Sequence, residues 1–196
     1  SVSGGNANAD NYTLTETTTQ FTIAPKPLTV SNGDLAYTKE YDGTTTASAT
    51  GALSVDKVGE DDVTVTIGSA VYANKTVGTG KTVNLSGLTL AGTKAGNYVL
   101  AADTYTFTNG VITAKEVTVS GITAENKEYD GTTAATLVYT GLTITGMVDG
   151  DQLSATATGA FVDKDVADGK TVTISKITLT GGDAGNYVLA GTGNQA

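Results

Sequence analysis

The chain has 196 residues, enough for one large domain or two small ones, since a domain commonly holds about 100 to 200 residues. It contains no histidine or cysteine, which excludes the usual serine and cysteine triads, zinc sites, disulfides and thiol redox centres. All 11 positive charges are lysine and the net charge is −9, so we expect no nucleic-acid partner, because nucleic-acid surfaces need a concentrated positive field. No stretch approaches the about 18 apolar residues of a membrane span, so we expect no membrane insertion by this segment.

Short runs of alternating apolar residues recur along the chain, and each predicts a β-strand with one face of threonine in water. In chain order, the clearest runs are residues 19–23, 63–67, 104–108, 111–113 and 117–120. Glycine or Asn-Gly breaks recur about every 8 to 12 residues, the spacing typical of a sandwich or barrel, and no window has a helical stripe. The sequence therefore predicts an all-β protein.

One predicted strand in each half of the chain changes its apolar parity midway. Val83 and Leu85 are followed by Leu88 and Leu90, and residues 172–179 show the same change. We expect either a β-bulge or a strand that crosses from one sheet to another at these places.

The sequence repeats itself with a period of about 88 residues. The block Lys-Glu-Tyr-Asp-Gly-Thr-Thr at 39–45 returns at 127–133, and Ala-Gly-Asn-Tyr-Val-Leu at 95–100 returns at 184–189. This period is too long for a solenoid and indicates a small domain copied in tandem.

The repeat divides the chain into three segments. We assign residues 1–27 to the tail strand of a preceding repeat, 28–115 to a first repeat domain and 116–196 to a second, which lacks its last strand. A short linker near 114–116 predicts an elongated two-bead particle. The tail strand either completes the first bead or docks onto the open edge of another molecule; we favour docking, because two prolines stiffen the connection that follows it.

The segment at 183–189 resembles the tyrosine corner of immunoglobulin-like domains, with Leu189 at the place of their second cysteine. We therefore predict two tandem immunoglobulin-like β-sandwich domains. The alternative is a β-grasp-like sheet, which would need a helix that the sequence does not indicate.

Taken together, the two repeated blocks resemble the tandem YDG-type domains, named after their Tyr-Asp-Gly motif, of bacterial surface adhesins and haemagglutinin-like secreted proteins. The residues that carry the resemblance are Tyr41, Asp42, Gly43, Tyr129, Asp130, Gly131, Asn97, Tyr98, Asn186 and Tyr187. The resemblance implies an extracellular protein, at a bacterial cell surface or secreted, in which such domains form a repetitive stalk or adhesive region. It implies neighbouring repeats of the same protein as partners and brings no catalytic residues.

We interpret the Tyr-Asp-Gly block as a tight turn. The aspartate can accept backbone N–H groups of the following threonines, while the tyrosine closes the end of the core with its hydroxyl in water. The alternative is that Tyr41 and Tyr129 contact a glycan or a protein.

Acidic loops are candidate calcium sites, because calcium takes about 6 to 8 oxygen ligands. The candidate ligands are Asp61, Asp62, Asp149, Asp151, Asp163 and Asp165. Their spacing lacks the regularity of known calcium loops, so we prefer solvated surface charge and expect no cofactor. A further hypothesis is an isopeptide bond between Lys39 or Lys127 and Asn97 or Asn186.

The leading functional hypothesis is a structural stalk that projects the binding region of a bacterial cell-surface adhesin. The alternative is an adhesive module that binds host glycan or protein directly, for which nine tyrosines, three phenylalanines and no tryptophan supply little aromatic surface. We expect no enzyme, because no acid and base pair recurs in both repeats.

Overall fold

The computed structural model describes residues 18–191, and it confirms the prediction of an all-β chain. The strands are β1 (Lys26–Leu28), β2 (Val30–Ser31), β3 (Ala36–Glu40), β4 (Ala49–Thr50), β5 (Ser54–Val55), β6 (Thr64–Thr66), β7 (Ser69–Tyr72), β8 (Gly78–Ser86), β9 (Thr89–Ala91), β10 (Tyr98–Leu100), β11 (Thr104–Thr113), β12 (Lys115–Ser120), β13 (Thr123–Ala124), β14 (Ala134–Ala135), β15 (Leu137–Val138), β16 (Thr143–Thr145), β17 (Ser154–Phe161), β18 (Val172–Thr180) and β19 (Tyr187–Leu189). Two short 3₁₀ turns, η2 (Ala95–Asn97) and η3 (Ala184–Asn186), are the helical elements of this part of the chain. Within residues 18–191, no helix is both long and apolar enough to cross a membrane.

The first unit is built around a five-stranded sheet of order β4-β3-β11-β8-β7. Strand β11 lies at its centre, antiparallel to β8 and parallel to β3. Phe107 and Ile112 are five residues apart, and both are buried in the core because the register of β11 against β8 shifts on either side of Gly110. Three small ladders flank this sheet: the parallel pair β1–β10 and the antiparallel pairs β2–β5 and β6–β9.

The second unit repeats the pairing of the first in shorter sheets, of orders β14-β17-β18 and β16-β12-β19, with a separate β13–β15 pair. The parallel pair β1–β10 aligns Lys26 with Tyr98, and the parallel pair β12–β19 aligns Lys115 with Tyr187. The same pairing at corresponding positions shows that the sequence repeat is also a structural repeat. Among residues 18–191, no strand of the second unit takes the place that β11 has in the first.

The expected change of apolar parity takes a different form in each unit. In the first, the chain turns at Gly87, with φ of 64°, and crosses from β8 in the large sheet to β9 in the β6–β9 ladder. In the second, β18 continues through the corresponding residue, Lys176, and the register shifts at a bulge against β17. Lys176 has φ of 51°, a left-handed conformation that is costly for a residue with a Cβ.

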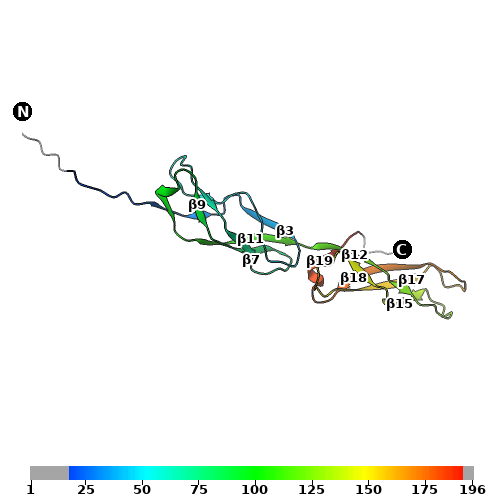
Figure 1. Cartoon of the computed structure of the whole chain (residues 1–196). Coiled ribbons are helices and arrows are strands. Elements are labelled where there is room, and N and C mark those ends of the chain that lie inside the picture. The colour runs from blue at the N-terminus through cyan, green and yellow to red at the C-terminus, as the bar shows by residue number, and fades with distance from the viewer. Residues whose placement is uncertain (1–17, 192–196) are drawn as a thin grey trace, which may run out of the picture.

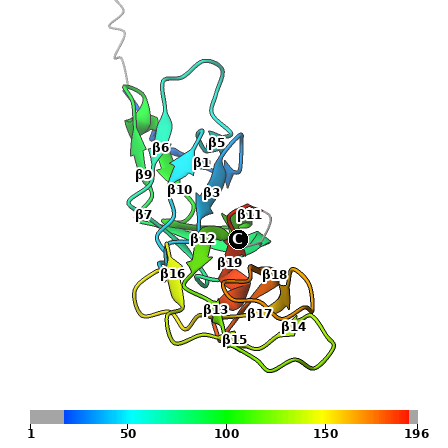
Figure 2. The ribbon, with the colours of Figure 1, turned by 90° about the vertical axis from the view of Figure 1, so that its right-hand side faces the viewer.

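The two units lie end to end, so the described chain is elongated (Figure 1). Only Ala114 separates β11 from β12, and the backbone therefore passes from one unit to the other almost without interruption. Strands β12 and β19 lie on the side of the second unit next to the first, while β15 and β17 lie farther from it (Figure 1). Figure 2 shows the chain from the end of the second unit.

The tail segment differs from its predicted form. Residues 18–25 belong to no strand, and the side chains of Phe21 and Ile23 are 89% and 96% exposed. The rest of the assigned tail, residues 1–17, lies outside the described residues, as do residues 192–196. The β-grasp alternative called for a helix, and residues 18–191 contain only the two 3₁₀ turns.

Candidate functional site at the junction between the two units

The Tyr-Asp-Gly block folds as a turn that the side chain of Asp42 holds together. One carboxylate oxygen of Asp42 accepts hydrogen bonds from the backbone N–H and the hydroxyl of Thr44, both at 2.8 Å. Lys39 Nζ lies 2.6 Å from the same oxygen, and Gly43 has φ of 77°, which favours glycine. Burial alone would raise the pKa of Asp42, but the bonds from Lys39 and Thr44 outweigh it and lower the pKa to about 2.

The second unit forms the same turn with its own residues. Asp130 accepts from the N–H and hydroxyl of Thr132 at 2.8 and 2.9 Å, Lys127 Nζ lies 2.9 Å away, and Gly131 has φ of 75°. The bonds from Lys127 and Thr132 lower the pKa of Asp130 to about 2. Since the turn is the same in both units, it is a local property of the motif and does not depend on a neighbour.

The two motif tyrosines have opposite environments. Tyr41 is 1% exposed, whereas Tyr129 is 63% exposed. The expectation of a hydroxyl in water therefore describes Tyr129 and is wrong for Tyr41, because the second unit covers the end of the first and supplies a partner. That partner is Asp151, whose carboxylate oxygen accepts the Tyr41 hydroxyl at 2.8 Å.

Asp151 joins side chains from both units. The hydroxyl of Tyr187, in its own unit, donates to the same oxygen at 2.6 Å, and Lys75 of the first unit lies 3.2 Å from the other oxygen. The Tyr41 and Tyr187 rings meet edge to face with centroids 5.4 Å apart, an arrangement that aromatic pairs prefer. A second polar contact crosses the junction where the N–H of Val77 donates to the side-chain oxygen of Asn186 at 3.1 Å.

Burial and hydrogen bonding act in opposite directions on the titration of Asp151. Burial alone would raise its pKa, but the bonds donated by Tyr187, Tyr41 and Lys75 outweigh burial and lower the pKa below its ordinary value. Burial also raises the pKa of Tyr187, and the neighbouring Asp151 adds to this, giving about 12. The junction is thus built on an ionised carboxylate that accepts from two neutral phenols.

Apolar packing runs through the junction as well. One buried cluster contains core residues of the first unit, such as Phe107 and Tyr41, together with Val117 and Tyr187 of the second. Val148 packs against this cluster, and a Cβ placed on Gly43 would lie only 2.8 Å from one of its methyl carbons. The two units therefore share a continuous core at the junction, in addition to the covalent link at Ala114.

The opposite end of the first unit carries a second copy of the Asp151 arrangement. Tyr98 donates to Asp61 at 2.6 Å and accepts from the N–H of Val58 at 3.0 Å. In the second unit, Tyr187 accepts from the N–H of Val148 at the same 3.0 Å. Each unit therefore has a proximal face with a paired aspartate and tyrosine, and a distal face with the Tyr-Asp-Gly turn.

The hydrogen bonds of Tyr187 also show that the expected tyrosine corner is wrong. In immunoglobulin-like domains, the tyrosine hydroxyl bonds to backbone a few residues upstream. Tyr187 instead bonds to Asp151 and Val148, more than 30 residues upstream, because the loop before β17 folds over the η3 turn. The Asn-Tyr block therefore builds the proximal face of a unit.

The candidate calcium ligands do not converge. Among residues 18–191, no three acidic side chains are placed to share a metal ion. Asp61 and Asp151 accept from tyrosines, Asp62 accepts from Thr93, and Asp163 pairs with Lys170. Asp149 and Asp165 join no such group. The structure therefore gives the calcium hypothesis no support within the described residues.

The isopeptide hypothesis fails on geometry. Lys39 and Lys127 each point into their own Tyr-Asp-Gly turn, where they contact Asp42 and Asp130. Asn186 faces Val77 across the junction, and its counterpart Asn97 is exposed at the proximal face of the first unit. Neither lysine is bonded to Asn97 or Asn186.

The junction itself was not predicted from the sequence. Alignment of the two repeats with each other contains one usable signal. Asp61 and Asp151 occupy the same position in the two repeats, although the residues just before them differ. Their pairing with Tyr98 and Tyr187 depends on the fold, and the contact with Tyr41 is made between units. Inspection of a single repeat could not find it.

The comparisons with known proteins agree with this repeat structure. The model of the YDG domain family matches the chain twice, at residues 24–106 and 113–195. The search of curated proteins and the search of solved structures each found no match. With most of its length in the two matches, the chain belongs to the YDG domain family and contains two tandem YDG domains.

Proposed function

We propose that these tandem YDG domains are spacer repeats of a bacterial cell-surface adhesin, which hold a binding region away from the cell. The observation that carries the proposal is the shared core at the junction, in which Tyr41 of one unit is bonded to the buried Asp151 of the next. A spacer has to resist bending, and a junction with buried polar and apolar contacts restricts bending more than a flexible linker does. The acidic surface, with a net charge of −9, would keep neighbouring stalks apart.

The surface or secreted location and the bacterial source belong to this proposal, since they come from the resemblance of the motif to adhesin repeats. Its partners are neighbouring repeats of the same protein. The proposed role is mechanical and needs neither cofactor nor catalysis.

For the detailed fold, we infer a variant of the immunoglobulin-like sandwich. The antiparallel β7–β8–β11 ladder and the small ladders around it support this inference. The parallel pair β3–β11 and the long-range bond of the motif tyrosine are departures from the simple pattern. An experimental structure in which the ladders of one unit do not face each other across a shared core would contradict the sandwich.

The adhesive alternative makes a different prediction for the exposed end of the second unit. A hollow of about 570 Å³ there is lined by Tyr129, Phe161 and charged side chains, which is the kind of surface that a glycan could contact. In the first unit, the second unit covers the corresponding face. We therefore interpret the hollow as a surface for packing against another unit, and not as a glycan site.

Small-angle X-ray scattering together with a glycan array separates the two functions. A rod-like particle that binds no glycan supports the spacer. A particle that bends freely, or glycan binding that is lost on Tyr129→Ala, would contradict it in favour of an adhesive module.

A further inference from the structure

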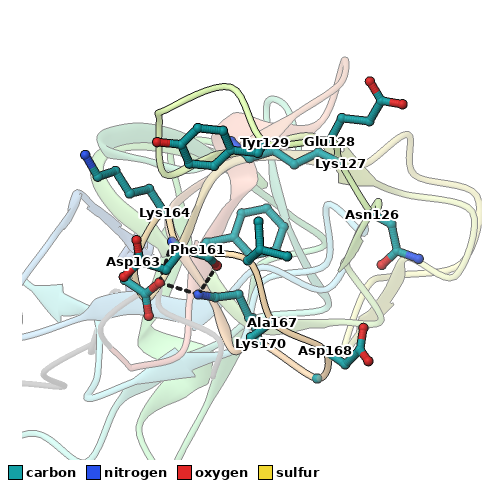
Figure 3. A pocket seen from close by; sticks show the side chains of 13 residues that line it. Asn126, Lys127, Glu128, Tyr129, Phe161, Asp163, Lys164, Ala167, Asp168 and Lys170 are labelled. Atoms are coloured by element: carbon teal, nitrogen blue, oxygen red, sulfur yellow. Dashed lines mark hydrogen bonds and ion pairs between the residues drawn. The ribbon is translucent and has the colours of Figure 1, made fainter.

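The distal face of the second unit has the residues of the junction, but within residues 18–191 no other unit packs against them. Tyr129 corresponds to Tyr41, Lys164 to Lys75 and Val166 to Val77. In the first unit, these three positions contact the second unit through Asp151 and Asn186. In the second unit, Tyr129 and Val166 are 63% and 87% exposed, and both belong to the lining of the hollow. Figure 3 shows Tyr129 and Lys164 in this lining.

The proximal face of the first unit is the complementary half. Its Asp61 and Tyr98 have the same hydrogen bond that Asp151 and Tyr187 have at the junction. Val58, the counterpart of Val148, is 58% exposed, and Asn97, the counterpart of the buried Asn186, is exposed. Asp151, Tyr187, Val148 and Asn186, which lie at the junction, thus each have a counterpart on this face.

The buried clusters lead to the same conclusion. Leu28, Val63 and Tyr98 form a small separate cluster at the proximal face of the first unit. The counterparts of Leu28 and Tyr98 in the second unit, Val117 and Tyr187, belong instead to the large cluster that crosses the junction. Contact with a distal face is what merges this small cluster into a larger core.

We propose that these two exposed faces dock head to tail, so that the distal face of one chain binds the proximal face of a second copy of this chain. Tyr129 of one copy then donates to Asp61 of the other, beside Tyr98, as Tyr41 donates to Asp151 at the internal junction. Lys164 takes the position next to Asp61 that Lys75 has next to Asp151. The proposal depends on the geometry of the junction and holds whether or not the protein serves as a spacer.

The segment before β1 adds to this interface. Ile23 lies three residues before Lys26, as the buried Ile112 lies three residues before Lys115. Docking therefore carries residues 18–25 of the incoming copy along the second unit of the receiving copy, where the described residues leave the place of β11 without a strand. An extended segment in that place adds backbone hydrogen bonds and covers two exposed apolar side chains.

Cysteine pairs test the docking, because the chain has no cysteine of its own. At the internal junction, a Cβ placed on Gly43 lies 3.9 Å from the Cβ of Val148, within the range of about 3.5 to 4.5 Å that a disulfide needs. The corresponding positions for docking are Gly131 on one chain and Val58 on the other. A Gly131→Cys chain and a Val58→Cys chain are mixed in a glutathione buffer, and the disulfide-linked dimers are separated by mass.

We expect the mixed dimer to exceed each like-with-like dimer at least tenfold, against the twofold excess of random pairing. Addition of Tyr129→Ala to the Gly131→Cys chain, or of Ile23→Ser to the Val58→Cys chain, should reduce that excess. Mixing Gly131→Cys with a chain carrying Val71→Cys, which places the thiol on β7 of the first unit, should give the random ratio.

The chain with Gly43→Cys and Val148→Cys supplies the internal reference, because Gly43 and Gly131 have φ of 77° and 75° and a side chain is similarly strained at both. If it closes its disulfide while the mixed dimer stays at the random ratio, head-to-tail docking is wrong and the junction stands. If it also fails to close, while urea unfolding shows that the chain with the strained Gly43→Cys turn is still folded, the junction geometry is wrong, and the spacer proposal loses its main support.

Discussion

Removal of the Tyr41 hydroxyl at the junction should lower the free energy of unfolding much more than removal of the Tyr129 hydroxyl at the exposed end. The Tyr41 hydroxyl is buried and donates at 2.8 Å to Asp151, whose side chain is itself buried. A hydrogen bond to a charged group contributes about 1.5 to 3 kcal/mol. Tyr41→Phe should therefore lower the free energy of unfolding by about 1.5 to 3 kcal/mol, because Asp151 stays buried with only Tyr187 and Lys75 as partners.

Tyr129→Phe is the matched control within the same chain. It removes the same atom from the same motif, but Tyr129 is mostly exposed and water replaces its partner, so we expect a change within about 0.5 kcal/mol. Urea unfolding of both variants in dilute solution, with an unchanged dependence on urea, measures the two values. At low protein concentration, docking between chains does not contribute.

A double-mutant cycle then assigns the cost to the contact with Asp151. In the Asp151→Ala background, the Tyr41 hydroxyl has lost its acceptor, so Tyr41→Phe should have little further effect. Equal losses for Tyr41→Phe and Tyr129→Phe, or the same loss in both backgrounds, would refute the assigned role of this hydroxyl.

Three further predictions follow from single residues. Lys176→Gly should stabilise the second unit by about 1 kcal/mol in thermal unfolding, because Lys176 has φ of 51° and its counterpart in the first unit is Gly87. Thr178→Gly in the same strand should instead destabilise the unit by a similar amount. Tyr37→Phe should leave the free energy of unfolding unchanged or raise it by about 1 kcal/mol, because the buried Tyr37 hydroxyl has no partner among residues 18–191. Tyr72→Phe should lower it by about 1 kcal/mol, because it removes a hydrogen bond to the Val111 carbonyl. A loss of stability in both variants would contradict this. Folding lowers the pKa of Asp151, so its stabilising effect is complete above its unfolded pKa of about 4 and is lost as the pH falls through the lowered value. In urea unfolding between pH 5 and 2, Asp151→Asn should therefore make the free energy of unfolding less sensitive to acid. An unchanged pH profile would contradict the assignment.

The strands and the tandem repeat were readable from the sequence because both depend on local patterns. Alternation such as that of Tyr105 and Phe107 indicates a half-buried strand wherever it occurs, and two copies of one motif reveal a repeat without any structure. The Asp42 turn was predictable for the same reason, since its bonds to Thr44 span only two residues.

The predictions that failed concern contacts between residues that are far apart in the sequence. Tyr187 sits in a segment that resembles a tyrosine corner, yet its partner Asp151 belongs to another loop. Tyr41 and Tyr129 have the same neighbours in sequence, and only the presence of a following domain decides which of them is buried. Local sequence could not distinguish them, because the difference arises at the junction.

The central claim is that the junction fixes the two YDG domains in one orientation, and residual dipolar couplings of the backbone amides test it most directly. If the shared core around Tyr41 and Asp151 is rigid, both domains give one common alignment tensor, and their relative orientation agrees with the structure shown in Figure 1. Tyr41→Ala should then separate the two tensors. Independent tensors of different magnitude in the unmodified chain would show that the domains move separately and would contradict the account.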